Sequence, residues 1–121
     1  MKKRILVTDD TEDILTNLKE YLEMEDYEVD TARNGKEALA QVRQRMPDLI
    51  ITDLLMNEMT GFELIKELKK IEAFRKIPVI VFSAKPIQGE EELAELGADR
   101  FVLKPSSPEV LVDNVAELLK E

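Results

Sequence analysis

Four short apolar runs, each followed directly by polar or charged residues, constrain this sequence more than any other feature. The runs cover residues 5–8, 47–52, 79–82 and 101–103. The residues that follow them are Asp9 with Asp10, then Asp53, Ser83 and Lys104. Runs that are continuous rather than alternating are typical of strands covered on both faces. If the four runs are neighbouring parallel strands, these five side chains meet at one edge of a sheet.

Segments with apolar residues at helical spacing separate the runs. The first is expected to open at residues 10–13 and to end near Glu25. Asn34 with Glu37, and Thr60 with Glu63, have the spacing of a capping box and predict the starts of two more helices. The inward positions are expected to be Ile14, Leu15, Leu18 and Leu22, then Ala38, Leu39, Val42 and Met46, then Phe62, Ile65 and Leu68.

The remaining segments complete the pattern. Residues 27–32 alternate between apolar and polar side chains, which predicts a more exposed edge strand. A fourth helix is expected over residues 87–96, with Gly97 as its C-cap. Ser107 and Pro108 supply a cap and a first-turn proline for a last helix whose inward residues are Leu111, Val115, Leu118 and Leu119.

Strand and helix therefore alternate five times, without a long linker or a repeat. This order predicts an α/β fold in which helices cover both faces of a parallel sheet through right-handed crossovers. A length of 121 residues and an apolar content of 44% fit one domain, residues 1–121. Ligands of such sheets bind beyond the carboxyl ends of the strands, where the strand order reverses.

Composition excludes several classes of function. The sequence has no cysteine and no histidine, which removes disulfides, thiol nucleophiles, histidine-ligated metals and a Ser-His-Asp triad. A net charge of −9 argues against direct binding to nucleic acid, because a phosphate backbone requires clustered basic residues. The apolar stretch after Arg4 is too short for a signal peptide or a membrane span, so a cytoplasmic location without a membrane role is expected.

Three carboxylates at one edge can stay charged together only beside a cation. Oxygen ligands without nitrogen or sulfur suit Mg²⁺, and Lys104 adds a fixed positive charge. A metal ion and an ammonium beside a carboxylate favour an anion, most simply a phosphoryl group. Asp53 is the single carboxylate that follows its apolar run, and it is therefore the candidate nucleophile. Lys104 and the Ser83 hydroxyl are expected to share the phosphoryl oxygens with the cation.

Asp9-Asp10, Asp53, Ser83-Ala84 and Lys104-Pro105 resemble the corresponding motifs of the receiver domains of two-component response regulators. The similarity covers nearly the whole chain, including Met56, Gly61 and the Gly97-Ala98-Asp99 lead into the last strand. It implies a flavodoxin-like (βα)5 fold with the sheet order 2-1-3-4-5.

The resemblance also implies roles for individual residues. Asp53 would take a phosphoryl group from a phosphohistidine of a sensor histidine kinase or phosphotransfer protein. Asp10 and Asp53, with Asp9 mainly through water and with the backbone carbonyl of Leu55, would hold Mg²⁺. The protein would then be a signalling switch that catalyses only its own phosphorylation and dephosphorylation.

The same resemblance assigns Ser83 to the phosphoryl group, Lys104 to an ion pair with it, and Ser83 with Phe101 to the switch. Lys104–Pro105 is expected to be a cis peptide. A downstream protein would bind through the last two helices and the last strand. The chain would be either a stand-alone receiver or part of a larger regulator.

Four positions differ from the family's common pattern or vary within it. Asn57 stands where proline is common, and Phe101 stands where tyrosine is common. Leu55 and Lys85 occupy the variable positions that flank the phosphoryl group. Because an apolar Leu55 cannot orient an attacking water, we expect slow self-dephosphorylation.

Other interpretations compete with this one. The same fold could serve as a phosphorylation-independent binding module. A phosphatase of the haloacid-dehalogenase type would require Asp-x-Asp after the first run, where this chain has Asp10-Thr11, and a flavin site would require a glycine-containing phosphate loop there. The methionines Met46, Met56 and Met59 are interpreted as core residues, and the acidic residues Glu90, Glu91, Glu92 and Glu95 as solvated surface.

Overall fold

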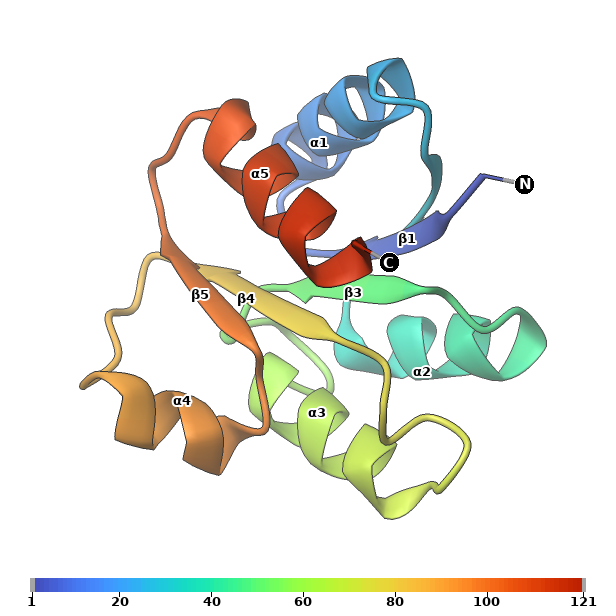
Figure 1. The fold of residues 1–121 in the computed structure, drawn as a ribbon. Helices are drawn as coiled ribbons and strands as arrows, with labels where there is room; N and C mark the ends of the chain where they lie inside the picture. The colour runs from blue at the N-terminus through green and yellow to red at the C-terminus, as the bar shows by residue number, and fades with distance from the viewer. Residues whose placement is uncertain (1, 121) are drawn as a thin grey trace.

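The computed structural model describes residues 2–120 and contains ten regular elements in strict alternation (Figure 1). The strands are β1 (Arg4–Thr8), β2 (Glu28–Ala32), β3 (Leu49–Thr52), β4 (Val79–Ser83) and β5 (Arg100–Leu103). The helices are α1 (Glu12–Met24), α2 (Gly35–Gln44), α3 (Gly61–Lys70), α4 (Glu90–Leu96) and α5 (Pro108–Leu119). Within residues 2–120, no helix combines the length and apolar character needed to cross a membrane.

The five strands form one parallel sheet in the order β2-β1-β3-β4-β5, so the predicted fold class and strand order are confirmed. Helices α1 and α5 cover one face of the sheet, and α2, α3 and α4 cover the other (Figure 1). The strand order reverses between β1 and β3, which pair directly. The carboxyl ends of these two strands therefore form the part of the sheet edge where a ligand site is expected.

Two apolar clusters lie on opposite faces of the sheet. Adjacent strand residues face opposite clusters: Ile51 packs with the α1 and α5 side, and Ile50 with the α2 and α3 side. All four residues of β3 are buried, as are all five of β4. The central strands are thus covered on both faces, which explains their continuous apolar sequence.

Two of the predicted helix caps are present. The Asn34 side chain accepts a hydrogen bond from the Glu37 amide, and Thr60 and Glu63 form a reciprocal capping box. Ser107 is the N-cap residue of α5, but its side chain makes no capping hydrogen bond within residues 2–120. Pro108 at the first helical position fixes φ there, so this helix begins without the serine's oxygen.

The predicted start of the fourth helix was wrong by three residues. Helix α4 begins at Glu90 rather than at Ile87, because Gly89 lies at φ 88° and ψ −168° and breaks the helical path. The amide of Gln88 instead donates to the Glu92 side chain at 2.6 Å. Gly97 ends the helix in the left-handed conformation, as the sequence predicts.

Two apolar positions also differ from expectation. Helix α2 ends at Gln44, and an extended Arg45 (φ −152°) leads into Met46, which is 55% exposed and does not belong to the core. In α3 the fully buried side chains are those of Leu64, Ile65 and Leu68, whereas Phe62 is only partly buried at the edge of the cluster. Strand β2 begins at Glu28, one residue after Tyr27.

Candidate functional site

Lys104 joins two carboxylates from different strands at the carboxyl edge of the sheet. Its ammonium nitrogen lies 2.7 Å from Asp9 Oδ2 and 2.9 Å from Asp53 Oδ2. Asp9 follows β1, Asp53 follows β3 and Lys104 follows β5, so three strand ends contribute to one cluster. Residues 44 to 95 positions apart in the chain are brought together because all strands run in the same direction.

The backbone fixes Asp53 on several sides. Its amide donates to the Thr8 carbonyl oxygen at 3.0 Å, and its own carbonyl oxygen accepts from the Thr52 hydroxyl at 2.8 Å. Its Oδ1 accepts from the amides of Leu54 at 2.7 Å and Leu55 at 3.4 Å. One carboxylate oxygen therefore faces the backbone of the following loop, and the other faces Lys104.

Gly61 makes this arrangement possible at the start of α3. Its amide donates to the Leu54 carbonyl oxygen at 3.0 Å. A Cβ atom added to Gly61 would lie 1.9 Å from the Asp53 carbonyl oxygen and 2.9 Å from Leu54 Cα. Only glycine allows α3 to approach the Asp53 backbone so closely.

Asp9 and Asp10 are neighbours in sequence but have different environments. Asp9 is buried, and its Oδ1 accepts from the Thr11 amide at 2.9 Å at the start of α1. Asp10 is exposed. One carboxylate oxygen from each of Asp9, Asp10 and Asp53 lies within 4.8 Å of the others, which is close enough for one metal ion to bind all three.

The charge and chemistry of this cluster fit a divalent cation. Three carboxylates and the single ammonium of Lys104 give a local charge of −2 (−3 + 1). Carboxylate oxygens without nitrogen or sulfur ligands match the preference of Mg²⁺. The exposed side chain of Asp10 leaves an approach for the ion from solvent.

The environment of Lys104 favours its charged form. Burial acts to lower the pKa of Lys104, but hydrogen bonds and charge from Asp9 and Asp53 outweigh burial and raise the pKa above its usual value. The ammonium also lies 5.3 Å from the centroid of the Phe82 ring, within cation–π distance. Lys104 is therefore held as a fixed positive charge.

Ser83, Leu55 and the Lys104–Pro105 bond adjoin this cluster, whereas Phe101 lies within β5. Ser83 is buried at the end of β4, its carbonyl oxygen accepts from the Lys104 amide at 2.9 Å, and its hydroxyl accepts from the Lys85 amide at 3.2 Å. The Lys104–Pro105 peptide bond is cis. Leu55 is 56% exposed. Phe101 is partly buried and packs against the apolar cluster between the sheet and α3.

Three features of the site were not anticipated from the sequence. They are the Phe82 ring beside Lys104, the Thr52 hydroxyl on the Asp53 carbonyl, and the buried Thr8 hydroxyl, which has no hydrogen-bond partner within residues 2–120. Phe82 and Thr52 directly precede Ser83 and Asp53 in sequence. That adjacency is the one signal that could have identified them.

Comparisons with known proteins agree with this fold. The family described as "Response regulator receiver domain" matches residues 5–116. The chain is 37% identical over 121 residues to the alkaline phosphatase synthesis transcriptional regulatory protein PhoP of Bacillus subtilis, covering 99% of this chain and 50% of PhoP. It is 32% identical over 120 residues to the polar-differentiation response regulator DivK of Brucella anthropi, covering 98% of each.

The chain thus spans about half the length of PhoP and nearly all of DivK. Among solved structures, the chemotaxis protein CheY4 of Vibrio cholerae superimposes with a TM-score of 0.92 at 29% identity, covering 98% of this chain and 100% of CheY4. TrrA of Thermotoga maritima, solved in complex with Mg(2+)-BeF, gives 0.85 at 37% identity, covering 97% of this chain and 99% of TrrA.

Proposed function

The chain belongs to the family of response regulator receiver domains of two-component systems, and on that premise we propose that Asp53 is its phosphoacceptor. The donor is a phosphohistidine on a sensor histidine kinase or phosphotransfer protein. The observation that carries the proposal is the position of Lys104, whose ammonium lies between the Asp9 and Asp53 carboxylates. This arrangement supplies a nucleophile and a fixed cation at one strand edge.

In the transfer step, an oxygen of the Asp53 carboxylate forms a bond to phosphorus while the phosphorus–nitrogen bond of the donor breaks. The electron pair of that bond returns to the imidazole nitrogen, and Asp53 becomes an acyl phosphate. Lys104 starts 2.9 Å from Asp53 and can pair with the incoming phosphoryl oxygens without leaving the site. The Ser83 hydroxyl donates to the same group once it turns from the Lys85 amide.

The residues that would hold Mg²⁺ are Asp9, Asp10 and Asp53, together with the carbonyl oxygen of Leu55. The support for this set is the cluster of carboxylate oxygens within 4.8 Å and its uncompensated charge. When bound, the ion supplies the positive charge that offsets the carboxylates and the phosphoryl group. TrrA, a relative that was solved with Mg(2+)-BeF, adds support from within the family.

Phosphorylation is proposed to shift a two-state equilibrium in the cytoplasm, with residues 1–121 acting as one receiver domain. Ser83 moves toward the phosphoryl group, and Phe101, now partly buried on the α3 side, turns further inward. Phe101 lies within β5 and Ser83 ends β4, which pairs with β5, so the change alters the surface formed by α4, β5 and α5. A downstream protein reads that surface, and the output is binding rather than catalysis.

Acetyl phosphate with Mg²⁺ tests the central claim. Intact-mass spectrometry of the wild-type chain should show one added phosphoryl group, and the adduct should be absent with EDTA. Asp53→Asn is the matched variant, because it removes the nucleophile and keeps the side-chain shape. A wild-type chain without the adduct, or an equal adduct on Asp53→Asn, would contradict the proposal.

A further inference from the structure

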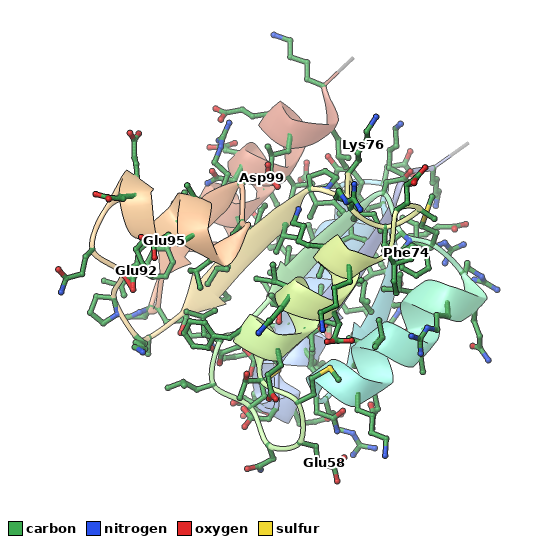
Figure 2. All side chains as sticks on the ribbon, turned by 90° about the horizontal axis from the view of Figure 1, so that it is seen from below. Glu58, Phe74, Lys76, Glu92, Glu95 and Asp99 are labelled. Carbon is green, nitrogen blue, oxygen red and sulfur yellow. The ribbon has the colours of Figure 1, made fainter. Side chains whose placement is uncertain are left out.

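A groove of about 560 Å³ lies between α3 and α4, on the face of the sheet away from α1 and α5. Figure 2 looks onto this face, with Glu92 and Glu95 labelled on α4 beside α3. The volume falls within the range of about 300–1,000 Å³ that is typical of ligand sites. None of the residues proposed for phosphoryl transfer lines this groove.

The floor of the groove is apolar and open to solvent. Phe62 and Leu96 line it. Both are only partly buried, and they pack against the apolar cluster on the α2 and α3 side of the sheet. No residue of α4 is buried, so this helix leaves apolar surface between itself and α3 uncovered. Gly97 continues the wall, and it lies so close to the Lys69 side chain that an added Cβ would be 3.1 Å from Lys69 Cε.

The rim of the groove is basic in a chain whose net charge is −9. Lys66, Lys69 and Lys70 line its α3 side, and Glu95 lies on its α4 side. Lys69 donates to the Arg75 carbonyl oxygen at 3.0 Å, and Lys70 pairs with Glu67 at 3.0 Å on the surface. Lys66 is exposed and has no ion pair within residues 2–120, so its ammonium is available to a partner.

We propose that this groove binds an acidic amphipathic segment of a partner protein. Apolar side chains of the segment would cover Phe62 and Leu96, and its carboxylates would pair with Lys66 and Lys70. A nucleic acid fits less well, because its phosphate backbone would leave the apolar floor of Phe62 and Leu96 uncovered. The lysines that select the acidic segment lie on α3, outside the α4, β5 and α5 surface proposed above, and the two surfaces share Glu95 and Leu96 of α4.

The test uses the unphosphorylated full chain and a fluorescein-labelled helical peptide of about 15 residues, with leucine on one face and glutamate elsewhere. Its control has glutamine in place of every glutamate. In a titration of ¹⁵N-labelled protein, amide shifts should saturate at Phe62, Lys66 and Gly97. Fluorescence anisotropy should give an affinity roughly tenfold higher for the glutamate peptide than for its control.

The double variant Lys66→Glu/Lys70→Glu should weaken binding of the glutamate peptide roughly tenfold. The matched control, Lys36→Glu/Lys120→Glu, carries the same change in net charge and should bind as the wild type does. The proposal fails if the shifts map to another face or do not saturate. Equal binding of both peptides, equal binding by both double variants, or a fall of the same size in the control variant would also overturn it.

Discussion

Gly61→Ala tests whether the backbone around Asp53 is held as tightly as its contacts indicate. The new Cβ would lie 1.9 Å from the Asp53 carbonyl oxygen, whereas such carbon–oxygen contacts are normally about 3.3 Å long. One of the two segments must therefore shift by about 1.4 Å. The φ angle of Gly61 is not in the positive range, so the expected effect comes from space rather than from backbone conformation.

The shift has two expected consequences. Overpacking of this size lowers the free energy of unfolding by about 1–3 kcal/mol. Displacement of Asp53 by about 1 Å lowers the rate of phosphorylation by about 100-fold, because the nucleophile loses its alignment. Urea unfolding followed by circular dichroism measures the first effect, and the rate of the mass adduct with acetyl phosphate and Mg²⁺ measures the second.

Gly89→Ala is the matched control. Gly89 has φ 88° and ψ −168°, a region that other residues adopt only at a cost of about 1–3 kcal/mol, but open space surrounds it. This variant should lose similar stability and keep the wild-type phosphorylation rate. A Gly61→Ala chain that phosphorylates at the wild-type rate, or two glycine variants that slow phosphorylation equally, would contradict a tight fit of Gly61 against Asp53.

Three further outcomes are expected. Lys104→Met should lower the free energy of unfolding at pH 7 by about 1–3 kcal/mol in metal-free buffer, because Asp9 and Asp53 lose their counter-charge. The folded-state pKa of Lys104 is raised, so the stability that Lys104 contributes is complete below about pH 10.4 and is lost at higher pH. A difference in urea midpoint between the wild type and Lys104→Met that persists unchanged to pH 12 would count against this. Leu55→Asn should shorten the phosphoryl half-life severalfold, measured as decay of the mass adduct, and an unchanged half-life in both Leu55→Asn and Lys85→Glu would contradict slow self-dephosphorylation. Mg²⁺ at about 100 times its Kd should stabilise the wild-type chain by about 2.7 kcal/mol in thermal melts, and Asp10→Asn should reduce this gain at the same concentration; an equal gain in both would exclude Asp10 as a ligand.

The sheet could be predicted from sequence because its central strands are buried on both faces. Residues 49–52 and 79–82 are continuous apolar runs, and the strand edge is marked by the polar residue that follows each run. In parallel strands the carboxyl ends share one edge, so Asp9, Asp53 and Lys104 could be placed together before any distance was known.

What the sequence could not supply depends on backbone geometry and on contacts between distant residues. A helix is expected over residues 87–96, but the φ angle of Gly89 delays its start to Glu90. Met46 has the right spacing for the α2 stripe, yet the helix ends two residues before it. The cation–π contact of Phe82 depends on the direction of the Lys104 side chain, which no local pattern encodes.

The sheet also separates the molecule into two halves that can be altered independently. Ile50 and Ile51 are neighbours in the chain, yet each contributes to a different cluster, and the backbone of the sheet lies between them. Substitutions on opposite faces should therefore add in their effects on stability, since they share no side-chain partner. Helices on either face can change to suit new binding partners. Such changes leave the position of Asp53 at the carboxyl end of β3 unaltered.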